Sequence, residues 1–339
     1  MKTLIVGGDI SAARSSNVIN KLALSMVSQM DFLDLDICNG ELPDDIKGYK
    51  LVLWFPHIDN HYAKTYPVKD RGSIMIISKV MRDGYTEATA VSRIFDFHAN
   101  AVICIYKDKE DSYFFSLVDA LGNTWCNTNN IAVLADTIKS FTRWSMGQIR
   151  MSYVKVHAPM SDISGKVRLE KDFIELNLDV ADKVANSAGT RFFGNFSTRC
   201  ASLFPSHRYM KGRYVVSPRN LDKRQIGPMD AVPVEPPYYH GDRKPSVDTP
   251  VQIKLYEMFD HINYMIHGHA FIKGASYTQH YFPCGDLREV EGIAEILYRG
   301  KRAVNLKNHG FLLVGKDPEE IRRTLDVIEF QPLDILKGV

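Results

Sequence analysis

Two hydrophobic periods alternate along the first 145 residues. Amphipathic stretches with helical spacing predict helices at 15–30, 86–98 and 130–144. Short apolar runs predict strands at 3–6, 32–37, 51–55, 73–77 and 101–106. Alternating strands and helices favour a wound α/β sheet with parallel strands, so we expect a Rossmann-like α/β domain over residues 1–150.

The first apolar run leads into the turn Gly7-Gly8-Asp9-Ile10-Ser11. A turn of this kind before a helix can bind a phosphate, because the backbone N–H groups of the helix start are free. The residues GGDISAA lack GxGxxG spacing, however, and two glycines after a first strand commonly form only a tight turn. A nucleotide-binding role for this domain and an ordinary turn therefore both stay open.

The pattern changes at residues 146–165, which mix polar and apolar positions and end in a Ser/Asp/Gly cluster typical of a linker. We expect a second domain over residues 151–339. Turn-rich and proline-rich segments fill much of its first half. Periodicity predicts helices at 170–188, 249–259 and 318–330 and strands at 264–269 and 303–307.

Composition narrows the class of protein. A chain of 339 residues with 45% apolar and 24% charged residues is typical of a soluble two-domain protein. The net charge of +2 argues against a nucleic-acid partner, and no apolar run is long enough to span a membrane. The first apolar run is too short for a signal peptide, and five scattered cysteines without a CxxC favour reduced thiols. A cytoplasmic location is expected.

Three histidines stand at the ends of predicted strands. His267 and His269 flank Gly268, and period-2 spacing puts both imidazoles on one face of an extended segment. His309 follows a second apolar run and precedes Gly310. Three imidazoles with an open position are typical of a catalytic metal site, with Zn²⁺ the favoured ion. The alternative is ordinary hydrogen-bonded histidines, because HxH pairs also occur by chance.

The surrounding residues resemble a known family. Six segments in order carry the resemblance: GNFSTR (194–199), VVSPRNLDK (215–223), KPSVDTPVQIKLY (244–256), YMIHGHAFI (264–272), FPCGDLREVEGI (282–293) and NLKNHGFLLVGKD (305–317). Together they resemble the class II aldolase/adducin family, which includes fuculose-phosphate and rhamnulose-phosphate aldolases, ribulose-phosphate 4-epimerase and methylthioribulose-phosphate dehydratase. The resemblance covers about residues 166–330. It implies a class II aldolase-like α/β/α domain, a small sugar-type substrate and a homotetramer with sites at subunit interfaces.

The resemblance also assigns chemistry. It implies that His267, His269 and His309 bind a divalent metal, usually zinc, and that Asp248 moves the proton. Breaking a C–C bond beside a carbonyl passes through an enediolate, which a metal stabilises as a Lewis acid while a carboxylate transfers the proton. The alternative for Asp248 is a carboxylate that only stabilises a helix N-terminus.

The family holds a substrate phosphate with short polar turns, and the matching residues here are Gly194, Asn195, Ser197, Ser217 and Ser246. Such turns are also common without a ligand. Pro218 removes one N–H donor and Val247 replaces a hydroxyl. Arg219 and Arg199 could compensate by bidentate contact, with an ordinary surface charge as the alternative for either. We therefore expect an acidic sugar derivative or a larger conjugate as substrate.

Three residues after the HxH strand are candidates for a second proton carrier, with aromatic packing at a subunit contact as the alternative: Tyr277, His280 and Tyr281. Cys284 is expected to be structural rather than a nucleophile. Asp286, Arg288 and Glu289 are interpreted as charges at a helix start.

The sequence thus predicts a metal-dependent class II aldolase-like lyase acting on a sugar phosphate or related acidic sugar derivative through a metal-stabilised enediolate. A 4-epimerase or dehydratase of the same family is the first alternative. A noncatalytic, adducin-like interaction module is the second, since a fold does not guarantee an activity. A separate activity of residues 1–150 also stays open.

Overall fold

The computed structural model describes residues 1–7, 18–30, 34–39, 42–56, 73–107, 112–151, 154–156, 167–184, 187–188, 191–203 and 212–332. The chain divides into two compact units, the first ending at Gly147 and the second beginning at Gln148. The turn at residues 8–11, where a phosphate site was one interpretation, lies outside the described residues.

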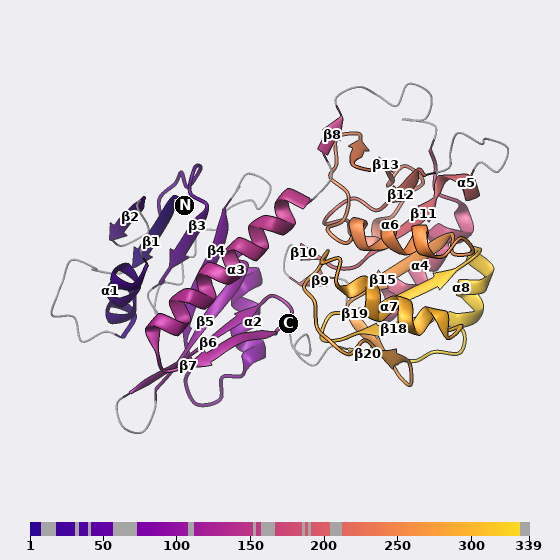
Figure 1. The fold of residues 1–339 in the computed structure, drawn as a ribbon. Coiled ribbons are helices and arrows are strands. Elements are labelled where there is room, and N and C mark those ends of the chain that lie inside the picture. Colours follow the sequence, from indigo (N-terminus) through magenta and orange to yellow (C-terminus); the bar gives the residue numbers. More distant parts are fainter. Residues whose placement is uncertain are drawn as a thin grey trace. The chain divides into compact units, whose positions relative to one another are not determined.

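The first unit contains a seven-stranded sheet in the order β2-β1-β3-β4-β5-β6-β7 (Figure 1). Its strands are β1 (Thr3–Gly7), β2 (Leu35–Asn39), β3 (Leu51–Trp54), β4 (Ile74–Val80), β5 (Ala101–Lys107), β6 (Tyr113–Asp119) and β7 (Thr124–Thr128). The first five pair in parallel, as a wound sheet requires, whereas β6 and β7 are antiparallel and were not predicted. The order 2-1-3-4-5 is the second common doubly wound order, so the Rossmann-like prediction is not confirmed.

Helices cover both faces of this sheet. The helices are α1 (Val18–Gln29), α2 (Glu87–Asp96) and α3 (Ile131–Met151). Residues of α1 and α3 share one apolar core with alternate strand residues such as Ile5 and Ile103. On the opposite face, the ring of Phe97 at the end of α2 packs against Trp54 at 4.9 Å. The Thr86 side chain accepts a hydrogen bond from the backbone N–H of Thr89 and so caps α2, in agreement with the predicted helix start at residue 86.

The second unit contains a nine-stranded mixed sheet in the order β17-β18-β19-β15-β11-β12-β13-β14-β8. Its strands are β8 (Val154–Val156), β11 (Asn195–Arg199), β12 (Tyr214–Val216), β13 (Val232–Glu235), β14 (Tyr238–His240), β15 (Tyr264–Gly268), β17 (Ser276–Tyr277), β18 (Ala303–Leu306) and β19 (Gly310–Gly315). Two small pairs accompany it: β9 (Ser187–Ala188) with β10 (Arg191–Phe192), and β16 (Ala270–Ile272) with β20 (Phe330–Pro332).

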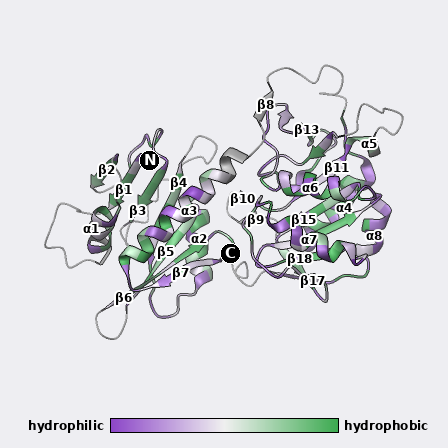
Figure 2. Cartoon of the chain, viewed as in Figure 1, coloured by the Kyte–Doolittle hydropathy of each residue, from purple (hydrophilic) through white to green (hydrophobic). Residues whose placement is uncertain are grey.

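Helices lie in two layers on this sheet, which confirms the α/β/α arrangement of the second unit. The helices are α4 (Lys171–Lys183), α5 (Cys200–Leu203), α6 (Thr249–Met258), α7 (Glu289–Tyr298), α8 (Pro318–Leu325) and the 3-10 turn η3 (Lys223–Gln225). Residues of α4 and α8 share one apolar core with alternate strand residues such as Phe196 and Ile266, while α6 and α7 share the other with Met265 and Leu312. Figure 2 shows the strands as mostly hydrophobic between helices with hydrophilic outer faces.

Three predicted segments end differently in the structure. The helix predicted to reach residue 188 ends at Lys183, because Ser187–Ala188 pair with β10. The helix predicted to reach residue 330 ends at Leu325, because Phe330 joins β20 and packs its ring on Phe311 at 4.9 Å. The predicted linker at 146–165 contains the end of α3 and β8, and its residues 157–165 lie outside the described part.

Among the described helices, none is both long and apolar enough to cross a membrane. None of the five cysteines, all in the described part of the chain, forms a disulfide, and Cys104 and Cys200 are buried.

Candidate metal centre and active site

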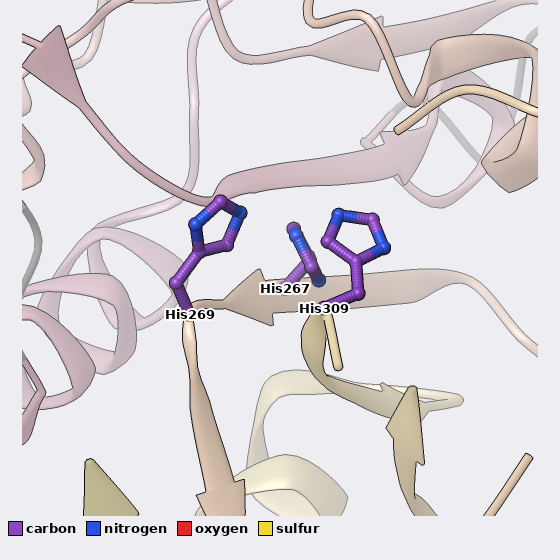
Figure 3. A group of neighbouring side chains, drawn as sticks. All are labelled: His267, His269 and His309. Carbon is purple, nitrogen blue, oxygen red and sulfur yellow. The ribbon is translucent and has the colours of Figure 1, made fainter. Parts of the chain in front are cut away.

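Three histidines converge where two neighbouring strands meet the loops at their ends (Figure 3). His267 lies in β15, His269 directly follows that strand, and His309 occupies the turn between β18 and β19. One ligand atom from each ring lies within 4.8 Å of the other two. The ring centroids are 4.8 to 5.4 Å apart, so one ion could contact all three.

Glycines beside the histidines allow neighbouring segments of the chain to pass close to one another. A Cβ on Gly268 would lie 2.6 Å from the Phe311 ring, and a Cβ on Gly310 would collide with the carbonyl oxygen of Gly268. Gly194, with a φ of +73°, passes so close that a Cβ would lie 2.5 Å from the carbonyl oxygen of His267. The His-Gly-His and His-Gly motifs are thus required by packing between β11, β15 and β19 as well as by the histidines themselves.

A hydrogen bond orients the His267 ring, and both His267 and His269 keep an unpartnered ring nitrogen. His267 donates from Nδ1 to the carbonyl oxygen of Phe311 at 2.8 Å, which leaves a lone pair on Nε2. His267 Nε2 and His269 Nδ1 are buried and have no hydrogen-bond partner within the described part of the chain. Burial and the neighbouring His309 lower the pKa of His267 to about 4. Burial and the other two rings also lower that of His269. Both rings are therefore neutral near pH 7, the form that binds metals.

His309 is oriented by a carboxylate, Glu289, that was not assigned to the site from the sequence. Its Nδ1 donates to Glu289 Oε1 at 3.0 Å, and Glu289 is only 2% exposed at the start of α7. Metal-binding histidines commonly donate their second N–H to a carboxylate in this way. Glu289 lies at the start of α7, as expected, but it is buried against His309, while Asp286 and Arg288 form an ion pair at 2.6 Å just before the helix.

The charges on the Glu289–His309 pair depend on each other. Burial disfavours a charged His309 ring, but Cys284 and Glu289 outweigh burial and hold the pKa of His309 well above its ordinary value. Burial raises the pKa of Glu289, and the attraction of His309 opposes that rise. The pair therefore retains a proton between its two members when no other cation is present.

Asp248 lies beside these histidines at the start of α6. Its Oδ2 accepts a hydrogen bond from Asn195 Nδ2 at 2.8 Å and lies 4.0 Å from His267 Nε2, while Oδ1 is buried without a partner among the described residues. Gln252 in turn donates to Asn195 Oδ1. The carboxylate makes no capping hydrogen bond to α6, so it is positioned for the histidines and not for the helix.

Part of the second unit matches a known protein family. Residues 178–275 match the family model described as Class II Aldolase and Adducin N-terminal domain. The resemblance to the class II aldolase/adducin family is thus confirmed for this part of the second unit.

An L-fuculose phosphate aldolase of Methanococcus maripaludis is 28% identical over 108 residues, which are 25% of this chain and 58% of that relative. This chain therefore matches little more than half of that aldolase. A solved L-fuculose 1-phosphate aldolase is 20% identical, with 48% of this chain and 85% of that chain covered at a TM-score of 0.33. A sugar-phosphate aldolase from Thermotoga maritima is 16% identical, with 46% and 94% covered at a TM-score of 0.33.

The serines expected to bind a substrate anion are engaged by the protein itself. The Ser197 hydroxyl bonds with that of Tyr256 at 3.0 Å in the core. Ser217 accepts from the backbone N–H of Phe196 at 3.2 Å, and Ser246 accepts from that of Asp248 at 3.4 Å. Their assignment to a substrate anion stays a prediction, as does that of Gly194 and Asn195.

Two cationic side chains accompany the site, Lys223 beside the histidines and Arg219 beside Asp248, and only Arg219 was predicted. A small cleft is lined by His267, His269, Asn195 and Lys223 and by residues of α4. Lys223 is 6% exposed and donates to the carbonyl oxygen of Leu221 at 2.9 Å, and burial lowers its pKa to about 8. Two guanidinium nitrogens of Arg219 are buried without a partner within the described part, and burial lowers the pKa of Arg219 while Asp248 raises it.

The candidates for a second proton carrier are exposed or half-buried. Tyr277 is 49% exposed and packs its ring against Phe271 at 5.3 Å, and the ring of His280 faces Phe282 at 6.3 Å. Tyr281 is half-buried. Their role as second proton carriers stays a prediction. Arg199 donates to backbone carbonyl oxygens of Ile262, Phe259 and Tyr256, which gives it a structural role.

Proposed function

We propose that the second unit is a metal-dependent lyase of the class II aldolase type. The observation that supports this most strongly is the set of three buried imidazoles, two with unpartnered nitrogens, beside an unpartnered carboxylate oxygen of Asp248. His267 Nε2, His269 Nδ1 and His309 Nε2 would hold a divalent ion, and neutral imidazoles suit zinc. Such an ion would act as a Lewis acid for negative charge that develops beside a substrate carbonyl.

Asp248 would move the proton. Its Oδ1 is the unpartnered atom, and the hydrogen bond from Asn195 to Oδ2 fixes the carboxylate beside the cleft. Gln252 fixes the Asn195 amide in turn, so the orientation does not depend on substrate. A carboxylate held within reach of a substrate carbon is the arrangement that general acid–base catalysis needs.

The cationic side chains favour an acidic substrate. Lys223 lines the cleft and Arg219 has buried, unpartnered nitrogens, whereas the three serine hydroxyls are engaged within the protein. We propose that Lys223 and Arg219 bind the phosphate or carboxylate of a sugar phosphate or related acidic sugar derivative. Epimerase and dehydratase chemistry would use the same residues. Zinc as the ion, the homotetramer and the cytoplasmic location stay predictions.

Metal analysis is the first test. We expect about one zinc or similar ion per chain, lost in His267→Ala and retained in His261→Ala, because His261 is an exposed histidine of the same segment. Failure of the native chain to take up zinc, manganese or cobalt on dialysis would refute the lyase and leave the adducin-like module.

Asp248→Asn tests the proton-transfer role separately. The variant should keep its metal and lose roughly 10²–10⁴-fold in turnover in a screen of aldolase, epimerase and dehydratase substrates. A variant that retains both metal and full turnover would remove Asp248 from the chemistry.

A further inference from the structure

Two buried cations reach the site from opposite faces of the nine-stranded sheet. Arg219 is tied to the segment that leads into α6: its backbone N–H donates to the carbonyl oxygen of Lys244, and Pro218 pairs with Pro245. Lys223 belongs to η3, which packs against α4. Because α6 shares one apolar core with the sheet and α4 shares the other, the two side chains start from different sides.

The neighbours of the two side chains agree with this separation. Burial lowers the pKa of Arg219, while Asp248 and Tyr239, a residue of the core beneath α6, raise it. Lys223 instead lines the cleft beside the HxH pair, together with residues of α4. The Asp248 carboxylate is near enough to attract both cations, so both belong to the site although their surroundings differ.

Arg219 presents one complete edge of its guanidinium group. Nε and Nη2 lie on the same edge of the plane, and both are buried without a hydrogen-bond partner among the described residues, Asp248 included. Two parallel N–H donors match two oxygens of a carboxylate or a phosphate. A guanidinium stays charged at neutral pH, and a buried charge without a partner is costly. This edge is therefore suited to an anionic ligand.

Lys223 has donors for a second anion. The residue is 6% exposed, and its ammonium group carries three N–H donors, of which the carbonyl oxygen of Leu221 accepts one at 2.9 Å. The cleft beside it offers the Asn195 amide and two neutral imidazoles as further polar groups. An acidic group in this cleft would therefore be drawn to Lys223.

We propose that Arg219 and Lys223 bind two different acidic groups of one substrate. This inference rests on the proposed function and narrows its substrate class to a short hydroxylated chain with an acid near each end, such as a sugar acid that also carries a phosphate. A substrate with one acidic group would satisfy one cation and leave the other buried and uncompensated. Two fixed acids would also determine which way round the chain binds beside the histidines.

Three small ligands test the proposal by calorimetry, and none needs turnover. 3-Phosphoglycerate has a carboxylate and a phosphate at the two ends of a short hydroxylated chain, glycerol 3-phosphate has only the phosphate, and glycerate has only the carboxylate. We expect the full native chain to bind 3-phosphoglycerate about 10–100-fold more tightly than either single acid, because a second charge-assisted contact is added.

Two variants assign the acids to their cations. Arg219→Gln and Lys223→Met should each weaken 3-phosphoglycerate binding about 10–100-fold. Glycerol 3-phosphate should lose affinity in only one of the two variants, and glycerate in the other. The matched control is Arg224→Gln, which removes an exposed cation next to Lys223 and should change none of the affinities.

The outcomes distinguish two subsites from one. Equal loss of glycerol 3-phosphate binding in both variants overturns the proposal, as does native binding of 3-phosphoglycerate no tighter than that of glycerol 3-phosphate. If Arg219→Gln does not fold, Arg219→Lys takes its place, because it keeps the charge and loses the two-donor edge.

The native affinities are measured with and without zinc. If the preference for 3-phosphoglycerate disappears without zinc, the metal binds the second acid and the proposal is overturned. A chain that takes up no zinc contradicts the metal-dependent function, whereas the preference of the metal-free chain still decides between one acidic subsite and two.

Discussion

Gly268→Ala tests whether the glycine between the two histidines is required by packing. The added methyl group would lie 2.6 and 2.7 Å from two carbon atoms of the Phe311 ring, where ordinary contacts begin near 3.4 Å. The ring must therefore move by roughly 0.8 Å. Phe311 is fully buried and packs against Phe330 at 4.9 Å, so it has little room to move.

Overpacking of this kind costs about 1–3 kcal/mol. For a unit of this size the midpoint of thermal unfolding should fall by about 2–12 °C. Metal affinity should fall as well, because His267 and His269 flank the displaced backbone. The matched control is Gly147→Ala in α3, where the added methyl group meets no atom within 4 Å; it should be neutral or slightly stabilising.

The assay is thermal unfolding of the full chain in a double-mutant cycle with Phe311→Leu. Truncating the ring should destabilise the native chain more than it destabilises Gly268→Ala, because the shorter side chain relieves the clash. Strictly additive effects, or a Gly268→Ala midpoint equal to that of the native chain, would refute the packing requirement.

Three further predictions concern the charges of the site. Glu289→Gln should weaken metal binding about 10–100-fold in a chelator competition, because it removes the carboxylate that orients His309; an unchanged affinity would count against that role. Lys223→Met should raise the KM for an anionic substrate about 10–100-fold with kcat little changed, and an unaltered KM would place the anion elsewhere. In the metal-free protein, burial lowers the pKa of His267 from its ordinary 6.5 to about 4. The folded protein therefore keeps its full stability above pH 6.5 and loses part of it as the pH falls toward 4, because only the unfolded chain takes up the proton in that range. Urea unfolding should show a loss of up to about 3 kcal/mol that His267→Asn lacks.

The parallel strands were the part of the fold most readable from sequence. Strands such as β3 and β4 are buried on both faces, so they form continuous apolar runs. The edge strand β7, with the sequence TWCNT, has no such run. In the second unit β13 contains Pro233, a residue that counts against a strand, yet it pairs with Val215. Short antiparallel strands depend on their partners more than on their own residues.

The residues of the candidate site could be predicted where a short sequence motif places them. His267 and His269 follow from period 2, and Asp248 from the family resemblance, but the convergence of His309 depends on the pairing of β15 with β19. Lys223 was missed because its contact with the cleft depends on where η3 packs. Glu289 did leave a signal: it lies four residues before Ile293 on the buried face of α7. A carboxylate on an apolar helical face predicts a buried partner.

The polar groups of the site favour a bound ion over a merely structural role. Leaving a buried polar group such as His267 Nε2 or His269 Nδ1 without a partner costs about 1–3 kcal/mol each. Burial of Glu289 is tolerable only because His309 faces it. A noncatalytic module would gain stability by replacing these histidines with apolar residues. An ion bound by the three imidazoles would satisfy both orphan nitrogens at once, which gives the arrangement a physical reason to persist.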